Sequence, residues 1–372
     1  MDFAYTEEQR MLADSLRRLV QDEWDFAARR ERAANPALDN RAWQQLAQLG
    51  VLGLNIAQTY GGFGEAPASL LPVHVELGRG LVSEPVIPSA VMSAALIAAS
   101  ADAAVQQRWL PALASGETIL SVAYQEPGHR YETEPTVCRL QPDGGDGFYL
   151  SGSKHLVWHG AAARAWIVSA LDDDGELVLL CVPADASGVI VLDTPTLDRS
   201  RCARIDFDRT PVQANAVLAR GQAARDGLRT ALDWGIAALC AHAAGAMERL
   251  LEITMDYLKT RRQFGQPLAV FQVLQHRMAD MLVAKEMALS MAYVAVAALS
   301  ETDVAQRRRM LASAKLEAAR AGRLVAQSAV QLHGGMGMTD ELEVGDYFKR
   351  LTMIDQLLGD SAEQLAVLES LA

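Results

Sequence analysis

The stretch YLKTRRQFGQPLAVFQ at residues 257–272 carries the strongest structural signal in this chain. It ends one helical pattern with three basic residues, turns at a glycine and a proline, and opens a second helical pattern at Phe271. Basic residues are favoured at helix C-termini, and Gly and Pro mark turns, so the stretch predicts a sharp connection between two helices. A second stretch, AVQLHGGMG at residues 329–337, ends a third helical pattern in a pair of glycines.

Long helical patterns extend outward from both stretches. Apolar residues recur every three to four positions over residues 230–260, 272–299 and 304–333, and alanine is dense in all three segments. Small side chains let helices approach one another closely. The C-terminal region, residues 223–372, is therefore predicted to be a bundle of four helices.

In the middle of the chain the apolar residues follow a strand pattern rather than a helical one. Between residues 119 and 222 four short runs are rich in β-branched or aromatic residues, and GGDG and DDDG turns separate them. No helical pattern lies between these runs, which favours a small antiparallel β domain over a parallel doubly wound sheet. Neither a GxGxxG nor a P-loop motif is present to form a conventional dinucleotide or nucleotide site.

The N-terminal region is again helical in pattern. Thr6 and Gln9 form a capping-box pattern that predicts a helix start between them, and further helices are expected over residues 70–80 and 88–110. The predicted fold is mainly α with a central β domain, in three parts: an N-terminal helical domain (1–118), a middle antiparallel β domain (119–222) and a C-terminal four-helix bundle (223–372).

Composition narrows the class of protein. Acidic residues outnumber basic ones by 46 to 34 in 372 residues, and the net charge of -12 opposes binding to nucleic acid or to anionic membranes. Four cysteines are too few for a disulfide framework, which favours a reducing, cytoplasmic location. No signal peptide or membrane insertion is expected. His155 and His159 lack acidic or cysteine companions, so no metal site is expected.

The order of helical, β and helical regions, together with RRQFG at 261–265 and QLHGG at 331–335, resembles the acyl-CoA dehydrogenase family of flavoproteins. Weaker similarities lie, in order, in LGRGLVSEP (77–85), YQEPG (124–128) and GSKHLVWHG (152–160). The tail at residues 347–366 is most similar to the small-subunit type of pimeloyl-CoA dehydrogenase, a branch whose members work beside a second, related subunit.

The resemblance implies a reaction and its components. An FAD-dependent acyl-CoA dehydrogenase introduces a double bond between the α and β carbons of an acyl-CoA thioester. The reaction needs a base for the α-proton, a polarised thioester carbonyl and a flavin that takes the β-hydrogen as hydride. The resemblance also implies an electron-transfer flavoprotein or a similar acceptor, and a homo- or hetero-tetramer with a related subunit.

Residues for FAD are carried over from the family motifs. By resemblance, Arg261 meets the FAD diphosphate, because its planar guanidinium donates two parallel hydrogen bonds. Gln331, Gly334 and Gly335 would approach the same dinucleotide from the neighbouring subunit. The alternative is that Arg261 only stabilises a helix end and Gly334 only stops a helix. The adenosine and phosphate region would be lined by Gln263, Phe264, Leu268, Phe271 and Gln272.

The isoalloxazine side departs from the family pattern. The family has a Thr before Glu-Pro and a Trp-x-Thr after the matched lysine, where this chain has Gln125, Leu156 and Trp158. We expect Gln125 to donate a hydrogen bond to the flavin ring and Trp158 to stack on it. The alternative is that this face holds no flavin and that the partner subunit holds a complete one.

The catalytic base departs from the pattern as well. The two family locations of the carboxylate align with Gly359 and Gly235, and glycine cannot take a proton. Asp360 is the candidate catalytic residue, with Asp233 as a second candidate, and either requires a shift of the backbone. Their alternative roles are a helix cap for Asp360 and a helix N-terminal charge for Asp233.

Three hypotheses follow. The chain is a complete acyl-CoA dehydrogenase, or a subunit that contributes part of the FAD site while a related partner provides the carboxylate. The third hypothesis is a non-catalytic acyl-CoA- or flavin-binding protein of the same fold.

Overall fold

A computed structural model describes residues 5–35 and 37–371, which pack into two compact units. A helical unit comprises the described residues up to Glu31, residues 67–82 and those from Ile236 onward, and a sheet unit comprises residues 32–66 and 83–235. These units do not follow the expected boundaries at residues 118 and 222, because α1 (Glu7–Glu23), α4 (Leu70–Arg79) and most of α2 (Phe26–Ala34) group with the C-terminal helices. The expected class, mainly α with a central β sheet, is confirmed.

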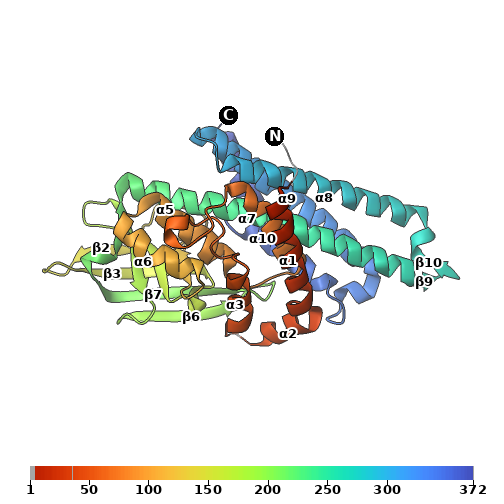
Figure 1. Cartoon of the computed structure of the whole chain (residues 1–372), viewed down its shortest axis with the longest axis horizontal. Coiled ribbons are helices and arrows are strands. Elements are labelled where there is room, and N and C mark those ends of the chain that lie inside the picture. Colours follow the sequence, from red (N-terminus) through yellow and green to blue (C-terminus); the bar gives the residue numbers. More distant parts are fainter. Residues whose placement is uncertain (1–4, 36, 372) are drawn as a thin grey trace. The chain divides into compact units, whose positions relative to one another are not determined.

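The helical unit is built around long helices. Helices α8 and α9 lie side by side, and α10 and α11 pack on α9 (Figure 1). The predicted capping box is confirmed at the start of α1, where Thr6 and Gln9 exchange hydrogen bonds of 3.2 and 3.1 Å. The elements are α1 (Glu7–Glu23), α2 (Phe26–Ala34, which runs on into the sheet unit), η2 (Pro67–Ser69), α4 (Leu70–Arg79), the second part of α7 (Gly221–Thr260), β9 (Arg262–Gln263), β10 (Gln266–Pro267), η6 (Leu268–Val270), α8 (Gln272–Ala298), α9 (Val304–His333), η7 (Gly334–Met338), α10 (Val344–Gln356) and α11 (Ser361–Ser370).

Helices α4 and α7 meet backbone to backbone. A Cβ atom on Gly245 of α7 would overlap the carbonyl oxygen of Val75 and lie 2.7 Å from its carbonyl carbon. A Cβ atom on Gly78 of α4 would likewise overlap the carbonyl oxygen of His242. Both positions therefore require glycine for close approach, which fixes where the two helices cross.

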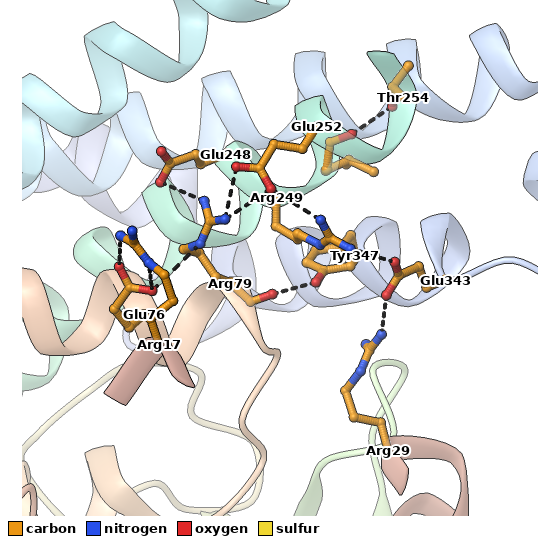
Figure 2. A network of polar contacts seen from close by, with 11 residues as sticks. Arg17, Arg29, Glu76, Arg79, Glu248, Arg249, Glu252, Thr254, Glu343 and Tyr347 are labelled. Atoms are coloured by element: carbon orange, nitrogen blue, oxygen red, sulfur yellow. Dashed lines mark hydrogen bonds and ion pairs between the residues drawn. The ribbon is translucent and has the colours of Figure 1, made fainter. Parts of the chain in front are cut away.

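A network of charged side chains surrounds this crossing (Figure 2). Glu76, buried on α4, accepts two hydrogen bonds from Arg17 of α1, at 3.0 and 2.5 Å. Arg79 pairs with Glu248 at 3.1 Å and Glu252 at 2.9 Å, both on α7. The network continues from Glu252 through Arg249, Glu343 and Arg29, so that it links α1, α2, α4, α7 and the start of α10.

The sheet unit contains one eight-stranded sheet. The strand order is β6-β7-β3-β2-β4-β5-β8, with β1 beside β4. Most neighbours are antiparallel, as expected, but β1 and β2 pair with β4 in parallel, which corrects the expectation of a wholly antiparallel sheet. The chain passes from β3 to β4 without pairing these two strands, and β4 lies instead on the other side of β2, where it runs parallel to β2. The strands are β1 (Leu120–Ala123), β2 (Arg139–Pro142), β3 (Phe148–Trp158), β4 (Ala165–Leu171), β5 (Leu177–Pro183), β6 (Val189–Pro195), β7 (Arg201–Val212) and β8 (Val217–Arg220).

Helical segments complete the sheet unit. The helix expected over residues 88–110 is wrong as one element, because it is split into a π-helix, η3, and two α-helices. Asp102 starts the last of these by accepting a hydrogen bond from the Val105 amide at 2.9 Å. The segments are α3 (Asn40–Gln48), η1 (Gln58–Tyr60), η3 (Val86–Ser93), α5 (Ala94–Ser100), α6 (Ala103–Ala114), η4 (Gly160–Ala162) and η5 (Ala214–Ala216).

A buried ion pair organises the loop after β1. Glu126 and Lys154 are 2% and 0% exposed, and the Lys154 Nζ atom lies 2.8 Å from a Glu126 carboxylate oxygen. The carboxylate also accepts hydrogen bonds from the backbone amides of Thr136, Val137 and Cys138, at 2.6, 2.6 and 2.9 Å. One carboxylate thus closes the loop between residues 126 and 138.

In the described chain, one helix, α8, is long and apolar enough to cross a membrane by length and composition alone. Core helices of water-soluble proteins meet the same criterion, and the buried face of α8 packs on α9. Four large apolar side chains of α8 are exposed, and we call them the exposed α8 residues: Val273, Leu282, Val283 and Met287.

We expect Gly245→Ala to destabilise the protein by more than about 3 kcal/mol, because the added methyl group would push α7 away from α4. The matched control is Gly345→Ala on α10, where the nearest atom to an added Cβ lies 4.0 Å away. This control should stabilise the helix by up to about 1 kcal/mol. Thermal unfolding of both variants measures the difference, and equal midpoints would contradict the close crossing.

Glu126→Gln should destabilise the protein by about 3 kcal/mol at pH 7, because it leaves the buried Lys154 ammonium without its counter-charge. Burial opposes ionisation of Glu126, but the charge and hydrogen bond of Lys154 lower its pKa to about 2. A lowered folded-state pKa contributes stability above the ordinary carboxyl pKa and loses it as the pH falls toward 2.

The stability difference between wild type and Glu126→Gln should therefore be full above about pH 5 and shrink between about pH 4.5 and pH 2. The exposed Glu117→Gln variant is the control and should change stability by less than about 0.5 kcal/mol. A penalty that does not vary with pH in acid would contradict the ion pair.

Candidate functional site

The predicted connection after α7 is a two-residue hairpin. Helix α7 ends at Thr260, and β9 and β10 pair across a turn at Phe264 and Gly265. These two residues have φ angles of 54° and 79°, both in the left-handed region, which is the geometry of a tight hairpin turn. The backbone amide of Leu268 donates to the carbonyl of Arg261 at 2.9 Å and closes the loop.

The side chain of Arg261 is available to a ligand. Arg261 is exposed, and within residues 5–35 and 37–371 its guanidinium makes no hydrogen bond or ion pair. An unpaired arginine in a chain of net charge -12 is suited to an anion such as a diphosphate. Phe264, at the tip of the hairpin, is 87% exposed and offers an aromatic face beside it.

The C-terminal end of α9, like Arg261, is exposed and available to a ligand. Gln331 is exposed, and no hydrogen bond of its side chain occurs in the described structure. Gly334 ends the helix with φ at 60°, and its amide donates to the Gln331 carbonyl. A Cβ atom on Gly334 or Gly335 would meet no atom within 4 Å, so backbone groups at this turn face open space.

These two ends lie together in a single chain. The Tyr257 ring stacks on the His333 ring, with centroids 4.3 Å apart and planes 28° apart. The Tyr257 hydroxyl also donates to the His333 carbonyl at 3.3 Å. This contact joins the ends of α7 and α9, which carry Arg261 and Gln331, within one chain. That Gln331 reaches the dinucleotide of a neighbouring subunit stays a prediction.

The remaining predicted nucleotide residues belong to the same region. Gln263 and Gln272 are exposed, while Leu268 and Phe271 are half-buried beneath the hairpin. Phe271 packs edge-on against Phe264 with ring centroids 6.0 Å apart. Unpaired donors, an exposed aromatic ring and open glycine backbones fit the adenosine and diphosphate of FAD.

Gln125, which was expected to donate a hydrogen bond to the flavin ring, lies in the sheet unit and forms its hydrogen bonds with residues of that unit. Its side-chain amide donates to the carbonyl of Arg130, and its own carbonyl accepts from the His155 amide at 3.0 Å. The Glu126–Lys154 pair holds this loop from beneath. The Gln125 amide would have to leave Arg130 in order to donate to a flavin.

Trp158, expected to stack on the flavin, is 8% exposed. Its indole nitrogen donates to the Ser200 hydroxyl at 3.3 Å, and that hydroxyl lies 3.2 Å from His159 Nε2. The neighbouring Leu156 sits at an irregularity of β3 with φ at 50° and is 53% exposed. This unit therefore presents an aliphatic side chain where the family pattern has a tryptophan.

Gly359 sits in a turn that is held from several sides. Its φ is 101°, which side-chain-bearing residues rarely adopt, and a Cβ there would overlap the amide of Gln364. Lys315 of α9, fully buried, donates to the carbonyls of Asp355 and Gly359 at 3.0 and 2.9 Å. Burial lowers the pKa of Lys315 to about 8.

Asp360 has a structural partner. Its carboxylate accepts a hydrogen bond from the Glu363 amide at 3.0 Å and caps α11, and the residue is 8% exposed. This is the alternative role given for it above, and its catalytic role stays a prediction. The expectation that Asp233 is a helix N-terminal charge is wrong, because α7 starts at Gly221 and Asp233 lies well inside it.

Lys315 and Gln364 hold the turn at Gly359, and this role was not predicted from the sequence. The signal for Lys315 was present, since it falls on the apolar stripe of its helix with Leu311 and Ala318. A lysine on such a stripe needs buried partners for its ammonium group. The partners of Lys315 are backbone carbonyls, and sequence patterns do not identify them.

Comparisons with known proteins agree along most of the chain. The family model for the acyl-CoA dehydrogenase C-terminal domain matches residues 226–369, and that for the N-terminal domain matches residues 6–117. Acyl-CoA dehydrogenase IpdE2 of Mycobacterium tuberculosis is 31% identical over 98% of this chain and 97% of its own. Acyl-CoA dehydrogenase FadE27 of the same organism is 29% identical over 88% and 86%.

Solved structures give the same result. A variant of the Tcur3481–Tcur3483 steroid ACAD matches with a TM-score of 0.87 and 31% identity, over 98% of this chain and 97% of that one. The ChsE4–ChsE5 complex from M. tuberculosis matches with a TM-score of 0.88 and 26% identity, over 100% and 98%. Two family models, full-length relatives and the fold agree, and the chain is a member of the acyl-CoA dehydrogenase family.

Proposed function

We propose that this chain is a subunit of an FAD-dependent acyl-CoA dehydrogenase, and that a related partner subunit provides the carboxylate that removes the α-proton. The chain contributes the nucleotide half of an FAD site. The complex passes its electrons to an electron-transfer flavoprotein or a similar acceptor. The observation that carries this proposal is the glycine turn at residue 359.

FAD is the cofactor of this family, and when bound it accepts the electrons that leave the β-carbon of the acyl chain. The proposed role of this chain is to bind the FAD nucleotide and to orient it. Arg261 neutralises the diphosphate, Gln331 donates from its amide, and the backbone at Gly334 and Gly335 approaches the same group.

The turn at Gly359 disfavours a base at the usual position of the family carboxylate. A glutamate at this position would need φ near 101°, a conformation that costs a non-glycine residue about 1–3 kcal/mol. It would also displace the Gln364 amide from the carbonyls of Leu358 and Gly359, where it donates at 3.4 and 3.3 Å. This supports the proposal that the proton goes to a carboxylate of a related subunit, and Asp360 of this chain is the alternative that the second test addresses.

Two further observations support an assembly with a related chain. Among the exposed α8 residues, Val273 and Val283 are 67% and 63% exposed, and exposed apolar surface is a feature of interaction sites. Both the Tcur3481–Tcur3483 and ChsE4–ChsE5 structures carry the names of two different chains. We propose a hetero-tetramer, of the kind in which a pimeloyl-type small subunit works beside a larger one, and acyl-CoA as substrate.

The first test compares the chain alone with the chain in complex. We expect the purified chain to reduce an artificial acceptor at a rate at least about 100-fold below that of the complex with its related large subunit, because the lone chain lacks a base. The measurement is acyl-CoA-dependent acceptor reduction, together with bleaching of the visible flavin absorbance.

Rapid turnover by the lone chain would overturn the subunit proposal in favour of a complete enzyme. A yellow complex that acyl-CoA never bleaches would instead favour the non-catalytic binding protein. The partner is best obtained by co-purification from the native host.

The second test concerns Asp360. We expect Asp360→Asn to leave turnover of the complex within about twofold and stability within about 0.5 kcal/mol, because Asn caps a helix as well as Asp does. A loss of about 100-fold or more in the rate of flavin reduction, with FAD still bound, would place the base at Asp360.

A further inference from the structure

We propose that Tyr257 and His333 form a positioning pair that holds Arg261 and Gln331 at the spacing of one FAD diphosphate. The inference rests on the proposed FAD site and assigns a task to two residues that do not themselves touch the cofactor. It comes from the stacked rings and from the way each ring is tied to the backbone of a binding motif.

On one side, Tyr257 is tied to the arginine. Its carbonyl accepts the Arg261 amide at 2.8 Å, which bonds Arg261 to the last turn of α7. The Arg261 carbonyl in turn accepts the Leu268 amide at 2.9 Å. With both backbone groups bonded, Arg261 cannot shift along the axis of α7 unless Tyr257 or the hairpin moves with it.

On the other side, His333 is tied to the glycine turn. It follows Gln331 by two residues and directly precedes Gly334, whose amide donates to the Gln331 carbonyl. Its ring nitrogen Nδ1 lies 2.8 Å from the Ala329 carbonyl, and because a carbonyl only accepts, Nδ1 carries the proton. Burial lowers the pKa of His333, so the ring is neutral at pH 7.

His333 is buried and closely packed, which restricts movement of its side chain. His333 is 3% exposed, and a Cβ atom on Gly337 would lie 3.0 Å from the His333 Cβ atom. Glycine at 337 thus lets the turn pack closely against His333. The Tyr257 hydroxyl satisfies the His333 carbonyl, one of the last-turn carbonyls that a helix end leaves without a partner.

The geometry is closer than that of a loosely packed aromatic pair. The Tyr257 and His333 centroids are 4.3 Å apart, whereas Tyr5 and Tyr293 in the same unit are 6.4 Å apart. The close stack fixes the separation of the two rings, and the hydroxyl hydrogen bond limits how far one ring can slide over the other. Loss of the stack would leave Arg261 and Gln331 intact but free to move apart, which weakens binding that needs both.

The experiment measures nucleotide binding apart from catalysis. ADP carries the adenosine and diphosphate of FAD, and calorimetric titration of the full-length chain with ADP reports on the nucleotide half alone. We expect Tyr257→Leu and His333→Leu each to weaken ADP binding about tenfold, and Tyr257→Phe, which keeps the stack, to stay within about threefold. Tyr293→Leu is the control and should leave ADP affinity unchanged.

A double-mutant cycle separates positioning from simple loss of stability. Arg261→Ala removes the group that the pair positions, so His333→Leu should have at most about a twofold effect on ADP binding in that background. The thermal midpoints of His333→Leu and Tyr293→Leu without ligand should be lowered to a similar extent.

The outcomes distinguish the inference from the proposed function. If the wild type binds ADP, Arg261→Ala weakens this binding and the Leu variants bind as tightly as the wild type, the positioning pair is refuted while the FAD site stands. An equal loss from His333→Leu with and without Arg261 also refutes positioning. If the wild type binds neither ADP nor FAD, alone or with its partner subunit, the FAD site itself fails and the inference fails with it.

Discussion

The contact between the backbones of α4 and α7 is the constraint on which the helical unit depends. Two helices that touch through Gly78 and Gly245 have one crossing point, since any side chain at either position would force them apart. The ionic network then surrounds that crossing, with Glu76 and Arg79 on one helix facing arginine and glutamate partners on the others. Once α7 is fixed at this crossing, its last turn, which carries Tyr257, is fixed relative to the same unit.

Much of the fold could be predicted from local patterns. The capping box at Thr6, the change of period near residue 119 and the hairpin after α7 each depend on a few neighbouring residues, and each is present in the structure. The errors have longer-range causes. Asp233 was placed at a helix start because the true start at Gly221 has no strong apolar stripe, and the parallel pairing of β4 depends on where the chain crosses the sheet.

The two halves of the proposed flavin site differed in how well they could be predicted. Arg261 and Gln331 stand in motifs, and the structure gives both exposed side chains without partners in the described residues. Gln125 and Trp158 were chosen by position alone, and the structure engages both with Arg130 and Ser200. Such contacts depend on loop conformation, so a motif comparison predicts the residue but not its hydrogen bonds.

The turn at Gly359 also has an evolutionary consequence under the proposed division of labour. A codon change that restored a glutamate there would place it on a backbone fitted to glycine, and its side chain would compete with Gln364 for space. Lys315 and Asp355 would still hold the old turn. Under the proposed division of labour, one codon change at this position would not give this chain a working carboxylate, and several coordinated replacements would be needed.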